Sequence, residues 1–298
     1  MTQDTQAILL LCAYQGGESR YHPLNVSEYN RVATVLHRLD LRPKDLLTQW
    51  PDLDISEDAN ISKDRIDWLF DRKINLAFQL NEWIANGIWI FARSDPDYPE
   101  MIRKALGNLA PPLLFGSGDH ELLSCGGSAI LGPDSIPNSR IKQSCEIADR
   151  FHSEKKTVIV GGRFKMANEI VKTTLTHKRK MIWVLFEGHL KQRLKKPIRR
   201  AIRNNNLVLV TPQSPRTPKD TGDKGYVGKI ATALTHEILY VDGSNFKDQS
   251  KRTDQYQIGA SVMDHAENAS LLAGRAISPE GTILYENDIP LWSGSNDD

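Results

Sequence analysis

The stretch TVIVGGRFKMANEIVKTTLTHKRKMIWVLF, residues 157–186, decides the fold class of this chain. Its two ends, residues 157–162 and 181–186, are short and continuously apolar, as in parallel strands that are buried on both faces. Residues 167–178 between them are expected to form a helix. Because a helix that joins two buried strands is typical of α/β proteins, this stretch predicts part of a parallel sheet covered by helices.

The same alternation continues on both sides. Further apolar runs of strand length occupy residues 128–132, 206–212 and 236–243, and helices are expected over residues 139–155, 195–205 and 228–235. This order predicts the fold class α/β, with a Rossmann-like doubly wound parallel sheet. Two strand candidates precede the sheet, at residues 87–95 and 110–118. After it, residues 255–274 are expected to be helical and residues 281–292 extended.

Residues 1–87 are predicted to form a small helical domain before the sheet. Helices are expected at residues 7–14, 25–39 and 62–87. Asn25 and Glu28 have the spacing of a capping box, and Gly87 suits the end of the third helix. The expected domains are therefore a helical one over residues 1–87 and a Rossmann-like one over residues 88–292, followed by a disordered tail over residues 293–298.

The composition limits the classes of function. With 38 basic and 37 acidic residues the net charge is +1, so any surface that attracts nucleic acid must be local. Cys12, Cys125 and Cys145 lack the spacing of a zinc site and are expected to be reduced thiols. No segment has the pattern of a signal peptide or a membrane span, which predicts a cytoplasmic protein without membrane contact. The histidines are scattered without a recognisable nucleophile, which predicts a protein that is not an enzyme and uses no metal or cofactor.

Residues 177–203 hold the strongest local excess of charge, with ten basic residues and one acidic residue. The apolar strand inside this segment is expected to be buried, so the charges must gather at its ends and on the helix after Pro197. Arg199 and Arg203 are four residues apart and share a helix face. Such a patch suits a phosphate backbone, an acidic protein partner, or simply a solvated helix face.

Glycines follow two of the predicted strands, Gly132 after one and Gly161 with Gly162 after the next. A glycine at such a place lets a ligand approach backbone N–H groups at a helix N-terminus, and it is equally the residue of an ordinary tight turn. Arg163 and Lys165 beside the second turn either pair with phosphate or are solvated surface charges. Among the aromatic residues, Trp183 and Phe186 are expected in the core, whereas Phe164 and Tyr226 are expected on loops, where they can stack on bases.

Residues 87–123 resemble the entry segment of the DNA-processing protein A (DprA/Smf) family. That family has an apolar strand, a polar residue with Asp, Tyr-Pro, a helix, and then Pro-Pro with Leu and Phe before Gly. The matching residues are Asp95, Tyr98, Pro99, Pro111, Pro112, Leu114, Phe115 and Gly116. The resemblance implies a Rossmann-like domain, grouped with nucleotide-sensing relatives and the "lonely guy" hydrolases, that binds single-stranded DNA and loads recombinase onto it.

Three binding motifs of the family are altered in this chain. Where the family reads Val-Gly-Ser-Arg, the sequence LGPDS keeps Gly132 and ends at Ser135. Where the family reads Ser-Gly-x-Ala-x-Gly-x-Asp, VGGRFKMAN has a Gly-Gly turn but Lys165 and Asn168 in place of the second glycine and the aspartate. The third motif, Arg-Asn-Arg or Arg-Asn-Lys, becomes YVGKIATAL, which keeps only Lys229.

The resemblance and the local charge predict a non-enzymatic DprA-like protein that binds single-stranded nucleic acid, within a bacterial DNA-processing or anti-phage defence complex. The residues expected to bind nucleic acid or a nucleotide are Gly132, Ser135, Gly161, Gly162, Arg163, Lys165, Lys195, Lys196, Arg199, Arg200, Arg203, Lys224 and Lys229. The expected partners are single-stranded DNA or another nucleic acid and a protein of such a complex, and the family resemblance makes a homodimer plausible. Two alternatives stay open: a scaffold or nucleotide-sensing subunit without DNA binding, and a nucleotide N-glycoside or phosphoribosyl hydrolase.

Overall fold

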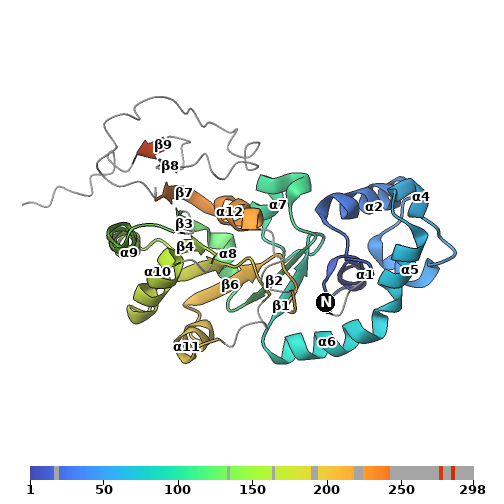
Figure 1. The fold of residues 1–298 in the computed structure, drawn as a ribbon, viewed down its shortest axis with the longest axis horizontal. Helices are drawn as coiled ribbons and strands as arrows, with labels where there is room; N and C mark the ends of the chain where they lie inside the picture. The colour runs from blue at the N-terminus through green and yellow to red at the C-terminus, as the bar shows by residue number, and fades with distance from the viewer. Residues whose placement is uncertain are drawn as a thin grey trace, which may run out of the picture. The chain divides into compact units, whose positions relative to one another are not determined.

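The computed structural model describes residues 1–16, 20–132, 135–162, 165–188, 194–217, 224–241, 275–277 and 283–285 (Figure 1). The chain divides into two compact units. Unit 1 consists of Met1–His120, Leu185–Lys195 and Leu209–Asp223, and unit 2 of Glu121–Val184, Lys196–Val208 and Lys224–Asp298. The expected domain boundary between residues 87 and 88 falls inside unit 1, and it stays a prediction.

Unit 1 contains the helical N-terminal region expected from the sequence. Its helices are α1 (Gln3–Cys12), α2 (Val26–Arg38), α3 (Leu46–Gln49), α4 (Ser56–Ala59), α5 (Lys63–Asp71), α6 (Lys73–Ala85) and α7 (Glu100–Leu106), with 3-10 turns η1 (Pro43–Asp45) and η2 (Gly107–Leu109). The expected capping box starts α2, where Asn25 and Glu28 exchange hydrogen bonds of 2.9 Å between backbone and side chain. Residues Ile8 to Leu11 of α1 are almost completely buried, so this helix lies within the hydrophobic core of the unit.

The helix expected over residues 62–87 is in fact two helices, α5 and α6, which meet at Arg72. The Arg72 side chain is buried, and its guanidinium donates hydrogen bonds to the carbonyl oxygens of Leu10 and, at 3.2 Å, Ala13. These carbonyls belong to the end of α1, where a helix leaves its last acceptors unpaired. The apolar periodicity of residues 62–87 could not reveal this break, because the cause lies in a distant helix.

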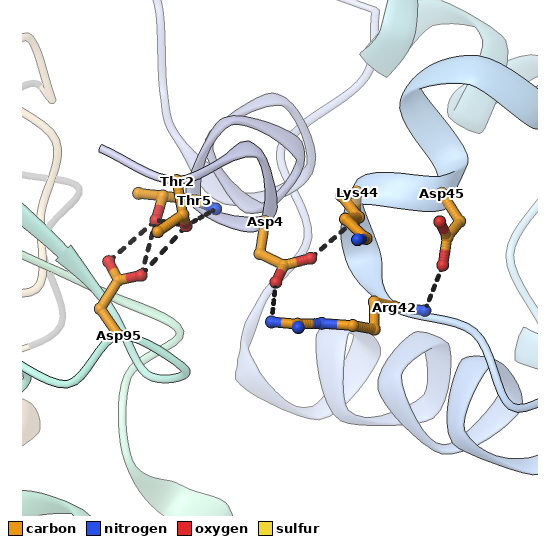
Figure 2. A network of polar contacts seen from close by, with 7 residues as sticks. All are labelled: Thr2, Asp4, Thr5, Arg42, Lys44, Asp45 and Asp95. Atoms are coloured by element: carbon orange, nitrogen blue, oxygen red, sulfur yellow. Dashed lines mark hydrogen bonds and ion pairs between the residues drawn. The ribbon is translucent and has the colours of Figure 1, made fainter.

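Asp95, one of the residues that carry the family resemblance, holds the first turn of α1 (Figure 2). It follows strand β1 (Trp89–Ala92) and is 7% exposed. Its carboxylate accepts hydrogen bonds from the Thr5 hydroxyl at 2.8 and 2.9 Å, from the Thr2 hydroxyl at 3.2 Å and from the Ala92 N–H at 2.8 Å. Asp95 is therefore a structural residue that joins two segments about ninety positions apart.

A second carboxylate anchors the same turn of α1 from another side (Figure 2). Asp4 is buried, accepts a hydrogen bond from the Lys44 N–H at 2.9 Å and pairs with the Arg42 guanidinium. Asp45 in turn accepts from the Arg42 N–H at 2.7 Å, which fixes the turn that presents both partners of Asp4.

The sheet has the strand order β1-β2-β6-β5-β4-β3-β7. In unit 1, β1 pairs antiparallel with β2 (Leu113–Ser117), and β2 pairs antiparallel with the end of β6 (Leu207–Thr211). In unit 2, β3 (Gly127–Leu131) pairs parallel with β4 (Val158–Gly161) and with β7 (Thr235–Tyr240), and β4 pairs parallel with β5 (Met181–Val184). The helices of unit 2 are α8 (Glu121–Cys125), α9 (Asn138–Ser153), α10 (Lys165–Thr176), α11 (Lys196–Arg203) and α12 (Lys224–Ala233).

The predicted parallel sheet is confirmed. The N–H groups of Met181 and Leu185 donate to the carbonyls of Asn206 and Val210 at 2.9 and 2.8 Å, so the hydrogen bonds advance in the same direction along β5 and β6. Together with the strand pairs of unit 2, this makes all five predicted strands parallel, and the apolar residues Ile130, Ile159, Ile182, Leu209 and Ile238 are among those buried in them. Strands β8 (Arg275–Ile277) and β9 (Ile283–Tyr285) pair antiparallel, with β9 inside the segment expected to be extended. The expected helix over residues 255–274 and the tail over 293–298 lie outside the described residues.

His152, on the face of α9 that packs against α10, makes the stability of unit 2 sensitive to pH. It is 3% exposed, and its Nε2 lies 3.2 Å from the Thr174 hydroxyl. Burial lowers the pKa of His152 to about 4, and the charge of Arg179 acts in the same direction. The unfolded chain therefore binds a proton between about pH 6.5 and 4 that the folded chain does not, so stability is full above pH 6.5 and is lost as the pH falls toward 4.

We expect His152→Gln to reduce this acid-side loss of stability, which amounts to at most about 3 kcal/mol. The check is the midpoint of urea unfolding at pH 7 and at pH 4.5 in wild type and variant. His37→Gln is the control, because His37 is an exposed histidine of α2 in unit 1. If the wild type and His152→Gln lose equal stability between these pH values, the assignment to His152 is wrong.

Candidate nucleic-acid interface

The parallel strands of unit 2 create a switch point at their carboxyl ends. Strand β3 lies between β4 and β7, and the chain passes through β4, β5 and β6 on one side of β3 before it returns to β7 on the other. In open α/β sheets, ligands bind beyond the carboxyl ends of the strands where the order reverses in this way. Gly132 follows β3 and Val241 follows β7. We call residues 132, 135–138, 161, 162, 165 and 224–229, which end or follow β3 and β4 or begin α9, α10 and α12, the rim.

The first rim glycine is closely packed. A Cβ atom at Gly132 would lie 3.1 Å from the Val241 carbonyl oxygen and 3.1 Å from the Met166 side chain at the start of α10. The ends of β3 and β7 and the first turn of α10 therefore meet at this residue. Of the predicted segments, these contacts place only Gly132, which lies beside the start of α10.

The next two glycines, which follow β4, shape the rim differently. A Cβ atom at Gly161 would lie 2.6 Å from the Val227 side chain, so α12 packs directly on the end of β4. Gly162 has a φ of +72°, which favours glycine. Its N–H donates to the Val184 carbonyl at 2.8 Å, and its carbonyl accepts from the Trp183 indole at 2.6 Å. Both backbone groups of Gly162 are thus used inside unit 2, and Trp183 is buried as predicted.

Two helix N-termini are joined at the rim by Lys165. This exposed lysine begins α10, and its Nζ donates to the Asn138 side chain at 2.7 Å. Asn138 begins α9, and the exposed Ser135 lies three residues before it. Helix N-termini attract anions through their unpaired N–H groups and the helix dipole. Asn138 is not among the residues predicted from the sequence, because no motif marks it.

The third part of the rim is the first half of α12. Lys229 and Tyr226 are half-buried, and the Lys229 Nζ lies 5.3 Å from the centre of the Tyr226 ring, within range of a cation–π contact. Tyr226 is helical, so its expected place on a loop is wrong. Lys224 begins this helix. Arg163 and Phe164 lie outside the described residues.

The remaining predicted residues form a separate group on α11. They are Lys196, Arg199, Arg200 and Arg203, and all four are exposed, whereas Ala201 is the buried residue of this helix. Lys195, just before the helix, is also exposed and belongs to unit 1. Because α11 precedes the amino end of β6, it ends at the edge of the sheet opposite the rim. We call these four residues of α11 the α11 group.

Two other features are absent from the residues that the structure describes. Among them, no group of three or more His, Cys, Asp or Glu side chains is arranged to hold a metal ion. Within the same part of the chain, no helix combines the length and the apolar character that crossing a bilayer needs.

A family model and one solved structure agree with this architecture. A family model described as DNA recombination-mediator protein A matches residues 89–245, just over half of the chain. The X-ray structure of DNA processing protein A (DprA) from Streptococcus pneumoniae is similar with a TM-score of 0.53 at 15% identity, over 84% of this chain and 90% of that one. A structure of DNA processing protein A from Helicobacter pylori, described by its single-stranded DNA binding mode, has a TM-score of 0.41 at 14% identity and covers 55% of this chain and 72% of that one.

No curated protein sequence matches the chain. The family match, which begins at β1 and extends just past β7, shows that the chain belongs to the DNA recombination-mediator protein A family.

Proposed function

We propose that this protein binds single-stranded nucleic acid at the rim, as a non-enzymatic member of its family. The observation that carries the proposal is the packing of α12, which holds Lys229 near the Tyr226 ring, on Gly161, four residues before Lys165 at the start of α10. Cations and helix N-termini supply attraction for phosphates, and a half-exposed aromatic ring supplies a surface for a base.

The chemistry of the rim favours a single strand over a duplex. Stacking on Tyr226 needs an unpaired base. In a duplex the bases are paired and stacked on one another, so none is available. The described rim offers point charges and backbone dipoles, which recognise phosphates without regard to sequence. We therefore expect binding that depends weakly on base sequence and strongly on salt.

The α11 group extends the same proposal. Its four exposed cations form no ion pair with any other described residue, so their charge is available to a polyanion. The description of the family as a recombination mediator supports placing this binding in DNA processing, with a protein partner in that process. We further propose that the protein is cytoplasmic and that it acts within a DNA-processing or anti-phage defence complex.

Replacing both rim lysines tests the proposal. In Lys165→Gln/Lys229→Gln two phosphate contacts are lost, so the slope of log affinity against log salt for a single strand should fall by about 1.4 in magnitude. The measurement is fluorescence anisotropy of a labelled oligothymidine at several salt concentrations. Lys104→Gln is the control, because Lys104 is an exposed lysine of α7 that pairs with Glu100.

Two results would contradict the proposal. One is a wild-type protein that does not bind oligothymidine even at low salt. The other is a rim variant whose affinity and salt slope equal those of Lys104→Gln. Turnover of a nucleoside monophosphate by the purified protein would instead support the hydrolase alternative.

A further inference from the structure

The amino-terminal edge of the parallel sheet, opposite the rim, carries an arrangement that the rim does not explain. Three consecutive helices, α9, α10 and α11, end there in the same kind of turn. In each, the second residue after the helix is left-handed, and its N–H and that of the next residue bond back to carbonyls near the end of the helix. The left-handed residues are Lys155, Lys178 and Asn205, with φ values of 61°, 54° and 54°.

Lysine is an unexpected residue at two of these three positions. The left-handed conformation strains any residue that has a Cβ atom, and glycine or asparagine is the usual choice. Asn205 follows that preference, whereas Lys155 and Lys178 do not. A positive charge near a helix C-terminus offsets part of the strain through the helix dipole. It gives no reason, however, for placing the charge at the strained position itself.

The strands that follow bring these turns side by side. Val158 at the start of β4 is aligned with Met181 at the start of β5, and the Met181 N–H donates to the Asn206 carbonyl at 2.9 Å. Neighbouring strands lie about 4.8 Å apart, so the three turns form a row with a spacing of a few ångströms. We call the exposed basic residues of this row, Lys155, Lys178, Lys180 and Arg203, the amino-edge row.

The amino-edge row is positive and unpaired among the described residues. None of its four side chains forms an ion pair there. Arg179, which lies between two members, donates to the His152 carbonyl at 3.2 Å and adds a further charge. The acidic side chain in these turns is Glu154, and it is already paired with Lys156 and Arg150.

We propose that the amino-edge row binds the sugar–phosphate backbone of a single-stranded nucleic acid that also occupies the rim, with the α11 group as the connection between them. This inference rests on the proposed function and adds a binding path to it. Helix α11 has eight residues and so spans about 12 Å, and its exposed cations run toward the amino edge of the sheet, where Asn206 bonds to Met181. A polymer with evenly repeated charges matches such a continuous track better than an acidic peptide does.

Substitution by glycine tests this without endangering the fold. In Lys155→Gly/Lys178→Gly/Lys180→Gln, two strained residues are replaced by the residue that their conformation favours, so the melting temperature should be unchanged or higher. Binding is measured by anisotropy with oligothymidines of about 8 and about 30 nucleotides, at several salt concentrations. For the long oligonucleotide the salt slope should fall by about 2 in magnitude, and for the short one it should stay the same.

The control and the rim variant separate this inference from the proposed function. Lys172→Gln removes an exposed lysine of α10 that pairs with Glu169, and it should bind both oligonucleotides like the wild type. An amino-edge variant that binds the long oligonucleotide like Lys172→Gln overturns the inference, while weaker binding by Lys165→Gln/Lys229→Gln leaves the proposed function standing. Loss of binding to polyglutamate with oligonucleotide binding unchanged also overturns it, in favour of an acidic protein partner. If the wild type binds neither oligonucleotide, the proposed function fails and the inference fails with it.

Discussion

Replacing Gly116 with alanine is expected to lower the free energy of unfolding by about 3 kcal/mol, because the added methyl group has no room. A Cβ atom at this position of β2 would lie 2.0 Å and 2.2 Å from two ring atoms of Trp89 and 2.5 Å from the Leu209 carbonyl oxygen. The Trp89 ring crosses β2 at Gly116, donates to the Gly118 carbonyl at 3.0 Å and stacks on Phe91 at 4.8 Å. The methyl group would displace both the indole and the backbone of β6.

Chemical unfolding followed by tryptophan fluorescence measures this effect. Gly228→Ala is the matched control, because a Cβ atom there meets nothing within 4 Å and the helix α12 should gain from alanine. Adding Trp89→Leu to Gly116→Ala should recover part of the lost stability, since one of the two obstacles is removed. A Gly116→Ala protein as stable as the wild type would show that the Trp89 ring does not lie across β2.

Replacing Asp95 with alanine is expected to cost a similar amount, about 3 kcal/mol or more, through lost hydrogen bonds. The buried carboxylate serves the Ala92 N–H and the hydroxyls of Thr2 and Thr5. Alanine leaves the buried Ala92 N–H without this acceptor and leaves the buried Thr5 hydroxyl with its contact to the Thr2 hydroxyl alone. Asp95→Asn should cost less, about 1 kcal/mol, because an amide oxygen can still accept from the Ala92 N–H while its NH₂ donates to the threonine hydroxyls.

The test compares the free energies of unfolding in urea of the wild type, Asp95→Asn and Asp95→Ala. Asp97→Ala serves as the control, since Asp97 lies two residues away and is exposed. Equal stabilities of Asp95→Ala and Asp97→Ala would mean that Asp95 does not hold the first turn of α1.

The fold of unit 2 could be predicted from sequence because each of its strands is a short, continuous apolar run. The apolar runs at residues 128–132 and 157–162 coincide within a residue with β3 and β4. Buried parallel strands need such runs, so composition and position agree. The break at Arg72 could not be predicted in the same way, because it depends on the carbonyls at the end of α1.

The basic segment 177–203 shows why a cluster in sequence is not a cluster in space. Strand β5 carries the chain from Lys180 at one edge of the sheet to the other edge, and α11 brings it back to Arg203. The basic residues of this segment therefore do not form one cluster. Lys155, which is distant in sequence, lies at the same edge of the sheet as Lys178 and Lys180. The sequence predicts that Lys155 precedes a strand, but it does not predict that Lys178 and Lys180 lie beside it.

The residues that carry the family resemblance could be recognised but not interpreted from the sequence. Asp95 and Gly116 match the family pattern, yet their contacts are structural: one holds α1 and the other accommodates Trp89. The Tyr98 hydroxyl likewise donates to the Pro111 carbonyl at 3.0 Å, which ties together two parts of the same motif. These partners are distant side chains and backbone groups that no spacing rule identifies.

Hydrogen–deuterium exchange of the full chain, with and without an oligothymidine of about 30 nucleotides, tests the central claim most directly. The account predicts slower exchange in the first turns of α9, α10 and α12 and in the segments that follow β3 and β4. Unchanged exchange in those segments, with protection confined to the helices of unit 1, would contradict it.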